Sequence, residues 1–210
     1  MNTIVTFEPC SRSKGDPEFI AFSLKKEMQV RFFNRVSLWR WAVAEFDPTV
    51  FGLRVNEQSL YTPNGKVPIR LSYETNITEV LIFYERKLDE AIRTDITEYA
   101  VAAGCNVEIL SHEYLISNEI EAVNCLNMLS YIIKHREVLT DRSLEQCVRI
   151  LRGCDVTVQE AVSVLAMDFR DAAGSIFFEA VRRGLINLPD VKKMMITGRT
   201  KFNVGGIPVG

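Results

Sequence analysis

The chain has 210 residues, of which 47% are hydrophobic and 25% charged, and its formal net charge is -2. This balance is ordinary for a globular protein and excludes a disordered or fibrous chain. The slightly negative charge excludes a protein that attracts nucleic acid with its whole surface, so a DNA partner would need a local basic patch. The length suits one large domain or two small ones.

The five cysteines, at positions 10, 105, 125, 147 and 154, are odd in number and form no C-x-x-C pair. Such spacing favours buried, reduced thiols over a disulfide framework or a zinc site. The N-terminal residues contain no apolar signal segment, and no apolar run approaches the roughly 20 residues that cross a bilayer. We therefore expect a soluble, cytoplasmic protein with no membrane partner.

The first part of the chain predicts an arm, a helix and three strands. Residues 8–17, EPCSRSKGDP, favour an extended or turn-rich arm. From 18 to about 46 the apolar residues recur near a helical period, which predicts one long helix that ends at Pro48. A meander of three strands should follow, because β-branched and aromatic residues are frequent at 50–58, 66–73 and 79–85.

A crossover unit and a helical half come next. Apolar residues three or four apart predict a helix over 88–103 with Gly104 at its C′ position, and residues 106–110 predict a strand paired in parallel. Thr157 and Glu160 match a capping box that starts a further helix. Three more helices are predicted over 118–135, 142–153 and 171–183. The sequence thus predicts a mixed α/β half and a helical half.

The third strand of the meander ends in Glu85-Arg86-Lys87. Residues i and i+2 of a strand point to the same side, so Glu85 and Lys87 can line one site while Arg86 faces away from it. Metal-dependent nucleases use carboxylates to hold Mg²⁺ against the scissile phosphate and a lysine near the attacking water. The E-x-K pattern therefore makes Glu85 and Lys87 candidate catalytic residues.

The predicted elements run in the order helix, meander, helix and short strand, with E-x-K at the end of the meander. This order is the layout of the PD-(D/E)XK nuclease core. Within that class the chain resembles the TnsA-like family of transposon endonuclease subunits. The resemblance implies an α/β fold with a PD-(D/E)XK (restriction-endonuclease-like) core and N-terminal arm over 1–138, and a C-terminal all-α, winged-helix domain with a tail over 139–210. It rests on EMQVRFFNRV (27–36), EFDPTV (45–50), NGKVPIRLSY (64–73), FYERK (83–87), AAGCNVEILSHEYL (102–115) and AVNCLNMLSYIIKHR (122–136).

The resemblance also implies a metal site. Glu27 takes the place of the family's helix glutamate, Glu85 that of its metal-binding acid and Lys87 that of its catalytic lysine. The family's proline-aspartate pair falls at Leu71-Ser72, so a serine stands where the aspartate is expected. Glu74, two residues further on, is the alternative metal ligand beside Glu85. A second alternative places the decayed pair in YTPN (61–64), with an asparagine at 64. An active site of this kind would use Mg²⁺.

The helical half has the length and order of a helix-turn-helix with a wing. Basic residues able to contact DNA phosphates lie in the arm, in the last predicted helix and in the wing. They are Arg12 and Lys14, then Arg182 and Arg183, then Lys192, Lys193, Arg199 and Lys201. The apolar, glycine-rich tail over 202–210 is a candidate contact for a partner protein.

Three functions remain open from the sequence. The first is a TnsA-like subunit of a DNA transposition machine, acting at transposon ends with a partner transposase and ATPase, with Mg²⁺-dependent cleavage weakened or lost. The second is a catalytically silent DNA-binding or scaffold protein that recruits partners. The third is a winged-helix regulator with an α/β sensor domain. A homo-oligomer is compatible with each. None of the glycine-rich nucleotide-binding motifs occurs, so the sequence offers no case for nucleotide binding.

Overall fold

The computed structural model describes residues 3–205, except for the side chain of Lys87. The chain has a mixed α/β fold made of two compact units. Unit 1 comprises the chain up to Trp41 together with Thr49–Ser117, and unit 2 comprises Ala42–Pro48 together with the chain from Asn118 onward. The sequence places the division at 138, whereas compactness groups residues 118–138 with the helical part.

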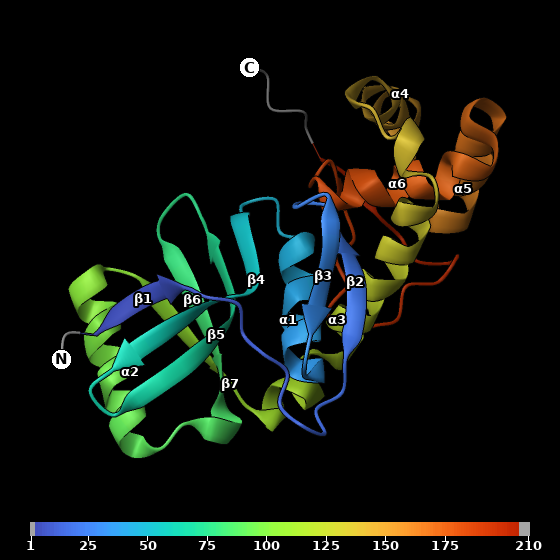
Figure 1. Ribbon diagram of the computed structural model, residues 1–210. Coiled ribbons are helices and arrows are strands. Elements are labelled where there is room, and N and C mark those ends of the chain that lie inside the picture. The colour runs from blue at the N-terminus through green and yellow to red at the C-terminus, as the bar shows by residue number, and fades with distance from the viewer. Residues whose placement is uncertain (1–2, 206–210) are drawn as a thin grey trace. The chain divides into compact units, whose positions relative to one another are not determined.

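Unit 1 is built on a five-stranded sheet (Figure 1). Neighbouring strands run antiparallel except for the last pair, which is parallel. The predicted meander and the parallel crossover are therefore confirmed, and a strand at the N-terminus is added that the sequence pattern did not indicate. The strands, in their order across the sheet, are β1 (Ile4–Phe7), β4 (Phe51–Thr62), β5 (Gly65–Glu74), β6 (Glu79–Tyr84) and β7 (Asn106–Leu110).

Helix α2 (Glu90–Ala103) makes the crossover between β6 and β7. It begins where the carboxylate of Asp89 accepts a hydrogen bond from the backbone N–H of Ile92, and it ends at Gly104, whose φ of 67° is left-handed. Its apolar side packs on the sheet, where Ile96 is fully buried in the core. The predicted helix and its glycine C-terminus are confirmed.

The long helix predicted over 18–46 is wrong in its first half. Residues 18–32 form a hairpin of β2 (Phe19–Ser23) and β3 (Met28–Phe32), and the helix α1 spans only Arg35–Glu45. Within β3 the apolar residues Met28, Val30 and Phe32 alternate with Gln29 and Arg31, which is the two-residue period of a strand, and Val30 and Phe32 are buried. The helix begins after Asn34, whose side chain accepts a hydrogen bond from the backbone N–H of Ser37 at 2.8 Å.

Unit 2 is mainly helical, and its predicted helices are confirmed. A capping box at Thr157 and Glu160 starts α5, as the sequence indicates. The elements are α3 (His112–Lys134), of which the residues up to Ser117 belong to unit 1, then α4 (Asp141–Leu151), α5 (Val158–Phe169), α6 (Ala173–Arg182), β8 (Ile186–Asn187) and β9 (Asn203–Val204), with 3-10 turns at Arg136–Val138 and Arg170–Ala172. Strands β8 and β9 pair antiparallel, and Thr157 forms an isolated bridge with Lys201.

Helix α6 is the most buried helix of the C-terminal segment. Its residues Ala173, Ile176, Phe177 and Ala180 are almost completely inaccessible to solvent. Within the described range, no helix is both long and apolar enough to cross a membrane. Of the tail predicted to contact a partner, residues 206–210 lie outside the described residues.

Candidate anion-binding site

The E-x-K segment is not an extended strand end. Glu85 and Lys87 bound a 3-10 turn that follows β6. The carboxylate of Glu85 accepts a hydrogen bond from Arg93 at 2.8 Å, across to helix α2. The side chain of Lys87 lies outside the described part of the chain. Residues 85 and 87 are therefore not alternate residues of a strand, so strand geometry does not place them on one face. Glu85 is already paired with a cation of the protein, Arg93.

Ser72 does not lie opposite Glu85. The register between β5 and β6 pairs Ser72 with Leu81 and Glu74 with Glu79. Ser72 is 1% exposed, and its hydroxyl donates a hydrogen bond to the side-chain oxygen of Gln58. This serine is thus a satisfied buried hydroxyl of the sheet and not the remnant of a metal ligand opposite Glu85.

Glu74 is held away from Glu85 by the same register. Its carboxylate lies 3.2 Å from the guanidinium of Arg54, which also lies 3.6 Å from Glu79. Glu79 and Glu85 are separated by the length of β6, which at 3.3 Å per residue is about 20 Å. Because Mg²⁺ needs its oxygen ligands at about 2.0–2.1 Å, Glu74 and Glu85 cannot share one ion in this fold.

The remaining predicted ligands are equally dispersed. Glu27 stands in the turn between β2 and β3 with a left-handed φ of 54°, not on a helix. Asn64 lies in the turn between β4 and β5, and its amide donates to Asp95 at 3.0 Å. Among the residues that the structure describes, no three His, Cys, Asp or Glu side chains gather in a way that could hold a metal ion. The predicted acids therefore do not fit a Mg²⁺ site.

Four basic side chains line one cavity of about 500 Å³ in unit 1: Lys14, Arg35, Arg70 and Arg86. Among the described residues, one carboxylate, that of Asp16, also lines it. Within residues 3–205, none of these four cations forms an ion pair with an acidic side chain. The cavity thus gathers four positive charges and one negative charge, and within the described range none of the four cations is ion-paired.

Arg70 is the unusual member of this set. It lies on β5 between Ile69 and Leu71 and is only 6% exposed. One guanidinium nitrogen donates to the side-chain oxygen of Asn56 at 3.3 Å, and Asn56 is neutral. Burial of a charge is costly unless the charge is paired, so a guanidinium held in this way favours an anion in the cavity beside it.

Three different elements bring the other cations to the cavity. Lys14 belongs to the N-terminal arm, Arg35 is the first residue of α1 and Arg86 lies in the 3-10 turn after β6. The N-terminus of α1 adds the positive end of a helix dipole, because its first N–H groups have no partner within the helix. Phe33 and Tyr84 also line the cavity and give it two aromatic side chains.

Most of the cations that the sequence predicts for DNA contact already have acidic partners. Both Arg182 and Arg183 donate to the buried carboxylate of Glu179, at 2.7 and 2.8 Å. The pairs Arg12–Glu18, Lys192–Glu121 and Lys201–Asp155 lie at 3.7, 3.4 and 2.9 Å. Lys14 lines the basic cavity, and neither Lys193 nor Arg199 has an ion-pair partner in the described range. Of the predicted cations, only Lys14 belongs to the cavity.

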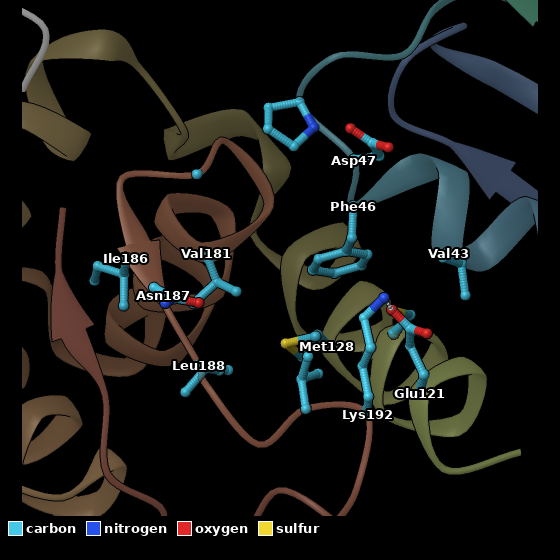
Figure 2. A pocket seen from close by; sticks show the side chains of 14 residues that line it. Val43, Phe46, Asp47, Glu121, Met128, Val181, Ile186, Asn187, Leu188 and Lys192 are labelled. Atoms are coloured by element: carbon cyan, nitrogen blue, oxygen red, sulfur yellow. Dashed lines mark ion pairs between the residues drawn. The ribbon is translucent and has the colours of Figure 1, made fainter. Parts of the chain in front are cut away.

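A second cavity, of about 400 Å³, lies within unit 2 and is mostly apolar (Figure 2). Phe46, Met128 and Leu188 contribute to its wall. Lys192 stands at this cavity beside Glu121, and the dashed line marks their ion pair. The cavity therefore contains no concentration of unpaired charge comparable with that in unit 1.

The sequence offered two signals for the basic cavity. Arg70 interrupts an apolar strand, and Arg86 alternates with the acid and lysine of the E-x-K pattern. Neither signal could indicate that residues so far apart in the chain meet. No family model matches the chain, and no curated protein matches it either.

Proposed function

We propose that the protein is a TnsA-like, DNA-binding subunit of a DNA transposition machine that has lost Mg²⁺-dependent cleavage. The observation that carries the DNA-binding part is the cavity in which Lys14, Arg35, Arg70 and Arg86 meet without acidic partners. A chain with a net charge of -2 has no general attraction for DNA, so four cations without ion-pair partners around one cavity favour a specific phosphate contact.

The order of elements supports a nuclease-like core for unit 1. Helix α1 precedes three antiparallel strands, β4, β5 and β6, and a helical crossover then adds β7 in parallel. That is the PD-(D/E)XK order that the resemblance implies. The dispersal of Glu27, Glu74 and Glu85 supports the loss of cleavage, because phosphodiester hydrolysis of this type needs carboxylates that converge on one metal ion.

The order of elements in unit 2 supports the winged-helix part of the proposal. After α4, residue Thr157 bridges to Lys201, and then α5, α6, β8 and β9 follow. In a winged helix the last helix would enter the DNA groove. Here the arginines at the end of α6 bind Glu179, which favours a structural or partner-binding role for this unit.

The proposal assigns no catalytic step to a metal ion. The four cations of the cavity would hold the DNA. The partner transposase would cut it, and the ATPase would be a further partner in the complex. A silent scaffold that binds partners but no DNA is the alternative, and it predicts that the four cations have no effect on DNA affinity.

Binding of fluorescently labelled linear DNA tests the proposal, measured by anisotropy at several salt concentrations. We expect binding that weakens as salt rises, because each phosphate contact releases counter-ions. The double variant Arg35→Gln with Arg86→Gln should bind more weakly than the unaltered protein. Equal affinities for the unaltered protein and the variant would contradict the proposal.

A further inference from the structure

Four basic side chains of unit 1 converge on one cavity. A protein that follows a DNA backbone spaces its basic residues along a groove, since successive phosphates on one strand lie several ångströms apart. Here Lys14, Arg35, Arg70 and Arg86 line one cavity of about 500 Å³, which lies within the volume range of small-ligand sites. This arrangement suits one compact anion with more than one negative charge.

We propose that this cavity binds the terminal phosphomonoester of a nucleotide, either at a DNA end or on a free nucleotide. A phosphomonoester carries about 1.5–2 negative charges at neutral pH, whereas each internal phosphodiester carries one. Arginine is suited to such a group because its planar fork can donate two parallel hydrogen bonds to phosphate oxygens. Three of the four cations are arginines.

The buried position of Arg70 determines where the phosphate sits. Its guanidinium is held from one side by Asn56, and its remaining donors have no acidic acceptor among the described residues. A charge at this depth is screened less by salt than a surface charge, so its attraction for an anion is stronger. The phosphate should therefore contact Arg70 at the inner end, with Arg35, Arg86 and Lys14 nearer the solvent, since these three side chains are exposed.

Phe33 and Tyr84 supply the reason to expect a nucleotide and not inorganic phosphate. Both aromatic residues line the same cavity and are partly exposed. A base can stack on an aromatic side chain whatever its identity, and such stacking is sequence-tolerant. Recognition here would use side-chain cations and aromatic rings, which explains why no glycine-rich phosphate loop is needed.

This inference rests on the proposed DNA-binding function for its choice of ligand, and the test separates the two. Identical single-stranded oligonucleotides with a 5′-phosphate, a 3′-phosphate or hydroxyl ends are compared by anisotropy, with AMP and inorganic phosphate as competitors. We expect an oligonucleotide with a terminal phosphate to bind at least about 10-fold more tightly than the hydroxyl form, and AMP to compete at lower concentration than phosphate. A preference for one phosphorylated end identifies that end as the source, and competition by AMP equal to the oligonucleotide identifies a free nucleotide.

The variant Arg86→Gln, at an exposed position, should abolish the preference for the phosphorylated end. Arg70→Lys keeps the charge but removes the fork, and should also reduce the preference. Arg152→Gln, an exposed arginine of unit 2, is the matched control and should leave the preference unchanged. Equal binding of phosphorylated and hydroxyl-ended oligonucleotides would overturn the inference. If Arg86→Gln then weakened both equally, the DNA-binding function would stand; if it weakened neither, that function would fail as well.

Discussion

Removal of two charges from the basic cavity should change the salt dependence of DNA binding by a calculable amount. Arg35 and Arg86 are both exposed and neither forms an ion pair in the described range, so Arg35→Gln with Arg86→Gln should fold normally. Each phosphate contact on single-stranded DNA contributes about 0.7 to the slope of log K against log salt. Both arginines face one terminal phosphate that carries about 1.5–2 charges, so their joint loss should lower the slope by between about 0.7 and 1.4. The affinity at about 0.1 M salt should then fall by about 5- to 25-fold.

The assay is anisotropy of a labelled, 5′-phosphorylated oligonucleotide at four or more salt concentrations. The matched control is Lys192→Gln with Lys201→Gln, which removes the same charge from positions that already face Glu121 and Asp155. Those acids would repel a phosphate, so the control slope should change by less than about 0.7. A control slope that falls by as much as that of the cavity variant would refute the assignment of DNA contact to unit 1.

Three further predictions follow from the buried groups. Glu179→Ala should lower the free energy of unfolding by about 3–5 kcal/mol, because it leaves the largely buried Arg182 without a counter-ion. Urea titration measures this free energy, and a loss below about 1 kcal/mol would contradict the prediction. Ser72→Asp should lower the free energy of unfolding by about 2 kcal/mol or more, because the position is buried. Mg²⁺ should not raise the melting temperature of this variant, because residue 72 lies opposite Leu81. A Mg²⁺-dependent rise in melting temperature would show that metal ligands do converge there. Burial raises the pKa of the Cys125 and Cys147 thiols to about 12, so a thiol reagent at neutral pH should modify the exposed Cys154 first, as peptide mass mapping would reveal.

Elements with a local sequence signal were predictable. The crossover helix begins at an aspartate cap and ends at Gly104, and both signals lie within the helix itself or next to it. The capping box at Thr157 and Glu160 is equally local. The β2–β3 hairpin was missed because the helical interpretation groups Phe22, Met28 and Phe32 on one face. The hairpin pairs Phe22 with Gln29 and so places Phe22 on the face opposite to Met28 and Phe32. A helical interpretation of this segment also excludes the antiparallel pairing of β2 with β3.

The candidate site could be predicted only in part. The E-x-K pattern located the end of β6 correctly, yet the side chain that carries the proposed function there is Arg86 and not Glu85. The strand register separates the residues of the predicted metal site, since it places Ser72 opposite Leu81 and not opposite Glu85. Register depends on the turn and on side-chain packing across both strands, and the spacing of residues along one chain does not determine it. Arg35 and Arg70 were missed because only the folded chain brings them together.

The central claim is that the protein binds DNA and does not cut it. Its most direct test is a single incubation of linear, 5′-phosphorylated DNA with saturating protein in Mg²⁺ or Mn²⁺, with the bound fraction and the cut fraction measured on native and denaturing gels. The account predicts that the unaltered protein binds the DNA and leaves it uncut. The double variant Arg35→Gln with Arg86→Gln should leave more of the DNA unbound. Cleavage that disappears in Glu85→Ala, or DNA that remains unbound at low salt, would contradict it.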